Sequence, residues 1–204
     1  MKKFLITGFV AIGLLGLIGC SNNSDSSKSD ISEKITSKKE EDNSSNISEK
    51  ITKKDLKLTQ KGGDDRVGYY DIPEDFFDFT DIDHPESDDI QYSDITTKNI
   101  ITLNVIDTSS LSKEEQEALT AQVAADNIAS YLQEDNNLED IELFYYNEFQ
   151  DKVYQDLATY KTGEVLSVNL FEHDGKIYYF AIEGSEEFVD TYWAPILDSF
   201  STTK

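Results

Sequence analysis

The sequence predicts an α+β domain in which a central antiparallel sheet is covered by helices. Three observations lead to this fold class. Apolar and polar residues alternate in the segments 99–107 and 141–183, as they do in half-buried strands. The segment 113–133 is rich in Ala, Glu, Gln and Leu, which favours a helix. Near the C-terminus, apolar residues recur every four positions from Phe188 to Phe200, which indicates a second helix.

The first strands are short. Residues 67–72 predict a strand that Pro73 closes, and residues 90–92 predict a second extended piece. The segment from Asn99 to Asp107 alternates and predicts a half-buried strand. One face of that strand would carry Ile101, Leu103 and Val105.

A long helix is predicted from Lys113 to Gln133. Ser112, with Glu115 three residues later, forms a capping box at its start. One face of this helix collects mostly small side chains, which allow a close approach to a sheet. These residues are Ala121, Ala124, Ala125, Ile128 and Leu132.

Four strands with short connections follow, and a final helix ends the domain. The strands are 141–149, 153–161, 164–172 and 177–183. Asp174-Gly175 between the last two is a strong hairpin signal, so an antiparallel meander results. Ser185 can cap the final helix. We expect Pro195 to break this helix near Trp193, because proline lacks the donor that a helix interior requires.

The first 19 residues have the features of a signal peptide. Lys2 and Lys3 precede an uncharged apolar run of 15 residues, shorter than the roughly 20 that an ordinary transmembrane helix needs. The run ends in Leu17-Ile18-Gly19-Cys20, which resembles the lipobox of bacterial lipoproteins. The resemblance implies cleavage between Gly19 and Cys20 and a diacylglyceryl group, with palmitate among the acyl chains, at Cys20. Two acyl chains give a stable anchor in the cell membrane.

Residues 20–63 are predicted to be an acylated Cys followed by a disordered polar tether. Residues 21–63 contain neither an aromatic residue nor Pro, so they cannot bury enough apolar surface to fold. They carry 9 Lys and 8 acidic residues, whereas residues 64–204 carry 7 basic and 33 acidic residues, a net charge of −26. The globular domain is therefore assigned to residues 64–204, and anionic lipid headgroups should repel it.

Three segments of this domain together resemble the PsbP-like superfamily. The first runs from Gly68 to Phe76 (GYYDIPEDF), the second from Gly175 to Phe180 (GKIYYF), and the third from Trp193 to Phe200 (WAPILDSF). The resemblance covers about residues 64–202 and implies a central antiparallel sheet with helices on both faces. It concerns fold positions, so it implies no catalytic residue. Photosynthetic function does not carry over, because the lipobox and the tether are typical of a cell-surface lipoprotein.

The composition excludes several classes of function. The acidic excess excludes an electrostatically driven nucleic-acid binder, and a single Cys excludes an internal disulfide or a multi-thiolate zinc site. The two histidines, His84 and His173, fall in an acidic loop and at a hairpin turn, and no GxSxG motif is present. We therefore expect no catalytic residues and no enzyme activity.

Acidic residues are densest between Asp71 and Asp94, and Phe76, Phe77 and Phe79 lie among them. Carboxylates at this density could bind Ca²⁺, with Asp78, Asp81 and Asp83 as candidate ligands. No EF-hand spacing is present, so a solvated acidic loop without a metal or other cofactor is the expected state. We expect two of the phenylalanines in the core; an exposed one would mark an edge that binds a partner.

These features predict a lipid-anchored protein on the outer face of the cell membrane of a Gram-positive bacterium, acting as a non-catalytic binding or accessory module. The membrane partner is the lipid anchor, and a basic surface protein or a cationic ligand would suit the domain's charge. Two alternatives remain open: an envelope hydrolase, with a pocket that holds a histidine beside a Ser or a buried carboxylate, and a surface module that binds divalent cations.

Overall fold

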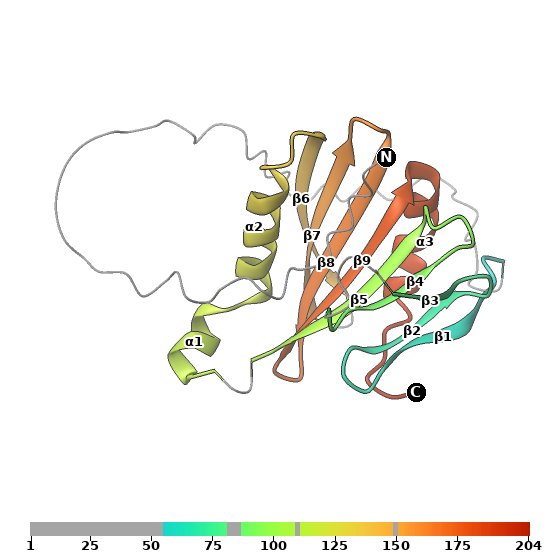
Figure 1. Ribbon diagram of the computed structural model, residues 1–204. Helices are drawn as coiled ribbons and strands as arrows, with labels where there is room; N and C mark the ends of the chain where they lie inside the picture. Colours follow the sequence, from blue (N-terminus) through green and yellow to red (C-terminus); the bar gives the residue numbers. More distant parts are fainter. Residues whose placement is uncertain (1–54, 81–86, 109–110, 149–150) are drawn as a thin grey trace, which may run out of the picture.

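The protein is described from a computed structural model that covers residues 55–80, 87–108, 111–148 and 151–204. The predicted signal peptide (residues 1–19) and most of the predicted tether lie outside the described residues. The described residues form one domain of strands with three helices (Figure 1).

Seven strands form one antiparallel sheet, in the order β3-β4-β5-β9-β8-β7-β6. A separate hairpin contains β1 and β2. The strands are β1 (Leu58–Asp64), β2 (Gly68–Pro73), β3 (Phe77–Phe79), β4 (Ile90–Ser93), β5 (Ile100–Asp107), β6 (Leu138–Glu148), β7 (Asp151–Tyr160), β8 (Glu164–His173) and β9 (Lys176–Ser185). The helices are α1 (Lys113–Ala118), α2 (Ala121–Leu132) and α3 (Glu186–Leu197).

Helices cover both faces of the seven-stranded sheet (Figure 1). The α2 helix packs on β7 and β8, and α3 packs on β8 and β9. Successive residues of β9 alternate between two core clusters, one under α2 with Tyr179 and one under α3 with Phe180. The β1–β2 hairpin adds Tyr70 and Ile72 to the α3 cluster. The predicted fold class, an antiparallel sheet covered by helices, is therefore confirmed, with strands as the larger part.

The predicted meander is confirmed strand by strand. Antiparallel pairing joins β6 to β7, β7 to β8, and β8 to β9. Asp174 and Gly175 have φ values of 48° and 75°, so both central residues of the turn are left-handed, as a two-residue hairpin requires. The predicted buried face of the 99–107 strand is also confirmed, since Ile101, Leu103 and Val105 all lie in the α3 cluster.

The long helix predicted over 113–133 is two helices. The break falls at Leu119 and Thr120, where the Thr120 side chain accepts a hydrogen bond from the Val123 N–H and caps α2. The capping box of Ser112 and Glu115 is present on α1. All five predicted face residues of α2 are buried, and its Ala residues allow it to lie close to the sheet.

The predicted break in the last helix is wrong, because α3 continues from Glu186 to Leu197 with Pro195 inside it. Pro195 lies in the last turn, so its missing N–H removes one backbone hydrogen bond just before the helix ends. The Asp198 N–H still bonds the Ala194 carbonyl at 2.8 Å. Ser185 caps the start of the helix as predicted.

The folded chain starts before the predicted boundary at residue 64, since β1 begins at Leu58. Only one large apolar residue lies in β1, so its composition resembled that of a tether. Two ion pairs join it to acidic residues beyond its turn: Lys57 with Glu74 at 2.9 Å and Lys61 with Asp71 at 2.7 Å. The Gly63 N–H also donates to the Tyr92 hydroxyl at 2.8 Å. Pairing with β2, rather than apolar content, therefore accounts for this strand.

The three sequence segments that resemble the PsbP-like family meet in the structure. Tyr70 of the first segment stacks on Phe180 of the second, with ring centroids 5.5 Å apart. Phe200 of the third contacts Tyr178 of the second, at 4.9 Å, and the Ser199 hydroxyl accepts a hydrogen bond from the Asp71 N–H. These motifs therefore join the hairpin, the sheet and the C-terminal segment in one aromatic cluster.

Candidate functional site

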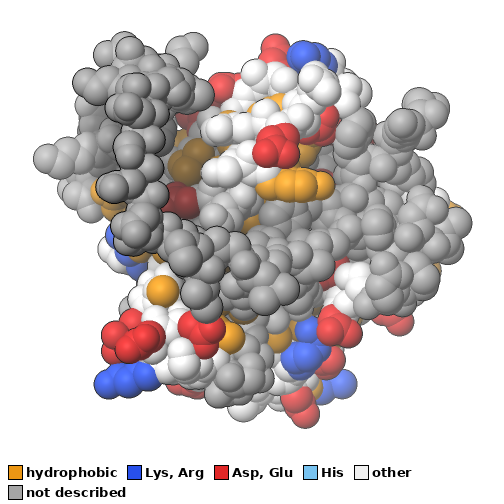
Figure 2. All heavy atoms as spheres, turned by 60° about the vertical axis from the view of Figure 1, so that its left-hand side comes forward, with side chains coloured by type: hydrophobic (Ala, Val, Ile, Leu, Met, Phe, Trp, Pro, Cys, Tyr) orange, Lys and Arg blue, Asp and Glu red, His pale blue; other side chains and the backbone are white. Residues whose placement is uncertain are grey.

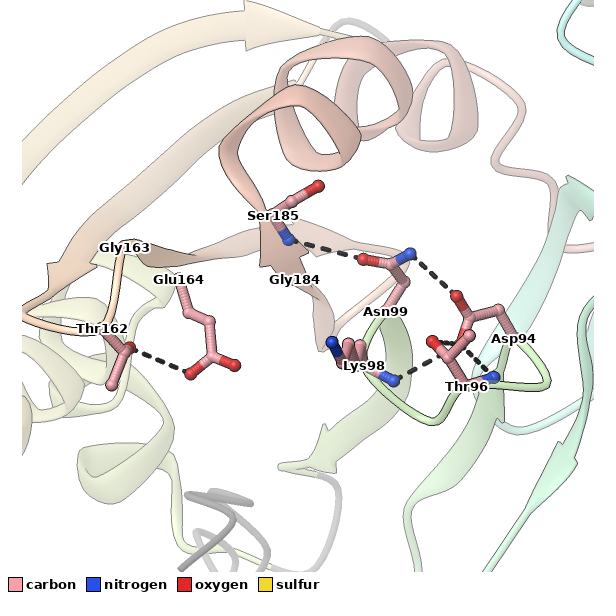
Figure 3. A pocket seen from close by; sticks show the side chains of 9 residues that line it. All are labelled: Asp94, Thr96, Lys98, Asn99, Thr162, Gly163, Glu164, Gly184 and Ser185. Carbon is pink, nitrogen blue, oxygen red and sulfur yellow. Dashed lines mark hydrogen bonds between the residues drawn. The ribbon is translucent and has the colours of Figure 1, made fainter. Parts of the chain in front are cut away.

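A solvent-open depression of about 420 Å³ lies at one end of the seven-stranded sheet (Figure 3). Three junctions form it: the β4–β5 turn, the β7–β8 turn and the junction between β9 and α3. The strand order brings these junctions together, because β5, β9, β8 and β7 are consecutive in the sheet. We call this depression the end pocket. Its lining residues are Asp94, Thr96, Lys98, Asn99, Thr162, Gly163, Glu164, Gly184 and Ser185.

Asp94 organises the β4–β5 side of the end pocket. Its carboxylate accepts hydrogen bonds from the Thr96 hydroxyl at 2.7 Å, the Asn99 amide at 2.9 Å and the backbone N–H groups of Thr96 and Lys98 at 3.0 and 3.3 Å. Burial alone would raise the pKa of Asp94, but these four hydrogen bonds outweigh it, so the pKa is lowered. Asp94 is therefore a structural carboxylate whose acceptor sites are already occupied.

The remaining polar groups of the end pocket face each other across it. Glu164 extends from β8 toward the β4–β5 turn, and the exposed side chain of Lys98 lies on that turn (Figure 3). The Thr162 hydroxyl donates to the Glu164 carboxylate at 3.0 Å. The Ser185 hydroxyl accepts from the Phe188 N–H at 3.2 Å, because Ser185 caps α3. One ammonium and one carboxylate thus remain to contact a small polar ligand.

Two carboxyl groups have strongly raised pKa values. Asp156 on β7 is 1% exposed, and neither of its carboxylate oxygens has a hydrogen-bond partner among the described residues. Burial, with the charge of Asp126 as a second cause, raises its pKa to about 8. Burial and the charge of Glu164 likewise raise the pKa of Glu183 to about 8. Asp156 lies on the α2 side of the sheet, between Tyr154 and Ala158 of the α2 cluster, and not in the end pocket.

The structure describes only some of the predicted site residues. Cys20 and Gly19, the predicted lipidation and cleavage residues, lie outside the described residues, as do Asp81 and Asp83. The third candidate metal ligand, Asp78, is exposed on β3, opposite Tyr92 in the register. Among the described residues no group of three or more His, Cys, Asp or Glu side chains could hold a metal ion.

Of the two histidines, only His173 lies in the described part of the chain, and it does not line the end pocket. His84 lies outside the described residues. His173 ends β8 at the opposite end of the sheet from Glu164, which begins that strand. Its ring packs edge-on against Phe200 at 5.6 Å, and its Nε2 lies 3.6 Å from Asp174. In the described structure His173 thus contributes to the aromatic cluster.

The phenylalanines of the acidic segment divide between the core and the surface. Phe76 is buried and stacks on Phe188 of α3, at 5.7 Å between centroids. Phe79 is half-buried, whereas Phe77 is 58% exposed on β3, at one edge of the sheet. By the criterion set from the sequence, Phe77 marks an edge that could contact a partner.

Sequence reasoning missed the residues of the end pocket and the burial of Asp156. The turn segments DITTKN and KTGE read as ordinary turns, and only the strand order shows that they are neighbours. A signal for Asp156 was present, because alternation in β7 places it on the same face as Tyr154 and Ala158. A charged residue on the helix-covered face of a strand is the sequence signal for such a buried carboxylate.

No helix in the described ranges is long and apolar enough to cross a membrane. No protein-family model matches the chain. No curated protein matches it either.

Solved structures give two similarities. The chain is similar to the solution structure of cyanobacterial PsbP from Synechocystis, with 14% sequence identity, a TM-score of 0.49, and coverage of 70% of this chain and 91% of that one. It is also similar to the crystal structure of PA94, a Pseudomonas aeruginosa protein of unknown function, with 9% identity, a TM-score of 0.33, and coverage of 65% and 90%. Neither similarity carries an argument about function, which rests below on this chain's own residues.

Proposed function

We propose that the protein is a lipoprotein of the PsbP-like family, anchored through Cys20 to the outer face of the cell membrane of a Gram-positive bacterium. There it acts without catalysis, as a binding module for a basic surface protein or another cationic partner. The lipobox supports the anchor, since its Cys is the single Cys of the chain. Two acyl chains on that residue would hold the protein at the membrane.

The distribution of charge is the observation that carries the binding proposal. Residues 64–204 have a net charge of −26, whereas residues 21–63, which include the predicted tether and most of β1, have +1. In Figure 2 several separate clusters of acidic side chains lie on the described surface of the α1 and α2 side, with fewer basic side chains among them. A negative domain near an anionic membrane is repelled by the headgroups and attracts cationic partners, whose encounter rate it increases. The exposed Phe77 adds an apolar contact at one edge of the sheet.

Carbodiimide crosslinking on intact cells tests this proposal. The reagent joins carboxylates directly to lysines in contact with them, so a basic partner should be captured through the acidic residues of the domain. Mass spectrometry should identify one major partner, and 0.5 M NaCl added before the reagent should prevent its capture, because salt screens the attraction.

The matched control is the variant Cys20→Ala, which removes the predicted lipid anchor and leaves the domain unchanged. This variant should be released into the medium, with loss of the cell-surface crosslink, or remain at the membrane as an uncut precursor. Crosslinks that join only residues within the chain, in wild-type cells, would contradict the binding role. A processed Cys20→Ala protein that stays at the membrane would contradict the anchor.

A further inference from the structure

The β6 strand forms one edge of the seven-stranded sheet and is its longest strand, at 11 residues. It pairs with β7 along its length, and within the described part of the chain no strand pairs with its other side. An antiparallel edge strand directs about half of its backbone N–H and C=O groups away from its neighbour. Such an edge is a template for a further strand.

The usual protection of such an edge is largely missing from β6. Natural sheets block their edges with charged side chains, especially Lys, and with Pro, bulges or very short strands, and of these β6 has mainly its acidic side chains. β6 contains neither Lys nor Pro, and its single register shift lies at its start, between Leu138 and Asp140. From Asp140 to Glu148 its register with β7 is regular. The opposite edge, β3, has only three residues.

All charged residues of β6 are acidic, and their charge distinguishes between two candidate partners for this edge: a second copy of this chain and a strand that carries Lys or Arg. They are Glu139, Asp140, Glu142 and Glu148. The first three have exposed side chains. A second copy of this chain would bring the same carboxylates to the shared edge, where like charges on paired strands repel. A strand that carries Lys or Arg would instead form cross-strand ion pairs with them.

The edge is held in place before any partner binds. The Tyr146 hydroxyl on β6 donates to Asn169 on β8 at 2.9 Å, across the intervening β7. The Tyr146 ring also packs edge-on against Trp193 of α3, with centroids 5.8 Å apart. A strand that is already ordered loses less entropy when it binds another strand.

An aromatic pair on the same strands already contacts a cation. Tyr145 on β6 lies opposite Tyr154 on β7, and Lys152 Nζ lies 4.4 Å and 5.0 Å from the centroids of the two rings. The Tyr145 side chain remains 54% exposed. A Lys or Arg side chain on an added strand could therefore approach the Tyr145 ring as a further cation–π contact.

We propose that β6 binds an extended basic segment of a surface partner by β-strand addition, so that backbone hydrogen bonds supply affinity and the β6 carboxylates supply charge selectivity. This inference rests on the proposed binding function and names its contact surface.

The test uses the full chain and a labelled eight-residue peptide of alternating Lys and Val, whose binding is followed by fluorescence anisotropy. A second peptide replaces each Val by Pro. It keeps the four positive charges but cannot form a regular strand, because Pro fixes φ and lacks the backbone donor. The Lys-Pro peptide should bind at least about tenfold more weakly if a ladder forms.

Two triple variants with the same change in net charge test whether the peptide binds at β6. The first is Glu139→Lys, Asp140→Lys and Glu142→Lys on β6. The second is Asp78→Lys, Glu114→Lys and Glu117→Lys, exposed positions on α1 and on β3, the opposite edge of the sheet. The β6 variant should lose about tenfold or more in affinity, and the control should stay within about threefold, because ionic contacts act at short range in salt.

Hydrogen exchange of the wild-type chain, followed by NMR, does not depend on how the variants fold. Alternate amides of β6 should gain protection when the Lys-Val peptide is added. The proposal is overturned if the Lys-Pro peptide binds equally well, if both triple variants weaken binding equally, or if the β6 amides do not change. It is also overturned if these amides are already protected in the free monomer, which would show that the chain's own segment occupies the edge.

Ultracentrifugation of the free chain tests for a second copy. A dimer that the β6 variant abolishes would overturn the proposal in favour of self-association. Peptide binding that leaves β6 unaffected overturns only the assignment to this edge. Binding of neither basic peptide would contradict the proposed binding function as well.

Discussion

The hydroxyl group of Tyr70 is buried in the core with no hydrogen-bond partner among the described residues. An unpaired buried polar group costs about 1–3 kcal/mol. Tyr70→Phe keeps the ring stacked on Phe180 and removes that group, so the free energy of unfolding should stay equal or rise by about 1 kcal/mol in urea denaturation. The contrasting variant Tyr146→Phe should lose about 1 kcal/mol, since it removes a hydrogen bond to Asn169. A clear loss in Tyr70→Phe would reveal a partner for its hydroxyl.

Asp156 should make the protein less stable as the pH rises. Its pKa is about 8 in the folded chain and near 3.8 in the unfolded chain, so between these values the folded state binds the extra proton. Stability then falls with pH, by up to about 1.4 kcal/mol per pH unit from this group. Asp156→Asn removes this pH-dependent contribution. The free energy of unfolding of the variant, relative to that of wild type, should therefore rise steadily from pH 5 to 8.

Urea denaturation at several pH values measures this difference, and Asp190→Asn provides the control. Asp190 is exposed on α3, so its substitution removes an exposed carboxylate instead of a buried one. Glu183, whose pKa is also raised, contributes the same slope to wild type and to both variants, so its contribution cancels in each difference. A difference between Asp156→Asn and wild type that stays constant from pH 5 to 8 would refute the buried, unpaired state of Asp156.

The β2 strand depends on a glycine at its first position. Gly68 has φ 81°, and a Cβ there would lie 2.5 Å from the Phe200 ring. Gly163, in the β7–β8 turn, has nearly the same φ, 82°, but nothing within 4 Å of a Cβ. Gly163→Ala should therefore cost about 1–2 kcal/mol from backbone strain alone. Gly68→Ala should lower the stability further, because the Phe200 ring must also move. Thermal denaturation of the two variants measures the difference, which is the contribution of packing against Phe200. Equal costs would contradict the contact.

Elements with strong local signals could be predicted, and those fixed by tertiary contacts could not. The hairpin at Asp174-Gly175 and the buried face of α2 follow from turn chemistry and periodicity. β1 could not be predicted, because Lys57 and Lys61 find their acidic partners only once the hairpin forms. Likewise, α3 tolerates Pro195 because packing of its apolar face stabilises the helix, and propensity alone does not show this.

The end pocket could not be predicted from the sequence either, because tertiary contacts bring its residues together. Its residues come from three segments, of which the first lies more than 60 positions before the second. Lys98 and Glu164 line the same pocket only through the non-sequential order β5-β9-β8. The overall acidity and the lipobox, by contrast, are properties of the sequence itself. The anchor and the class of partner therefore remain predictions from the sequence, whereas the edge strand β6 became apparent only in the structure.

The charge of the whole domain should make its stability depend on salt. Mutual repulsion among 33 acidic residues opposes the compact state, and added NaCl screens it. The melting temperature should rise by several degrees between 20 and 500 mM NaCl. CaCl₂ at equal ionic strength should add no further rise if the acidic segment is a solvated loop. A further rise that EDTA reverses would instead favour the divalent-cation alternative.

Mass spectrometry of the mature N-terminal peptide tests the central claim most directly. Protein extracted from membranes should begin at Cys20, with a diacylglyceryl group on its sulfur. A chain that retains residues 1–19, or begins at an unmodified Cys20, would contradict a lipid-anchored acidic domain outside the cell.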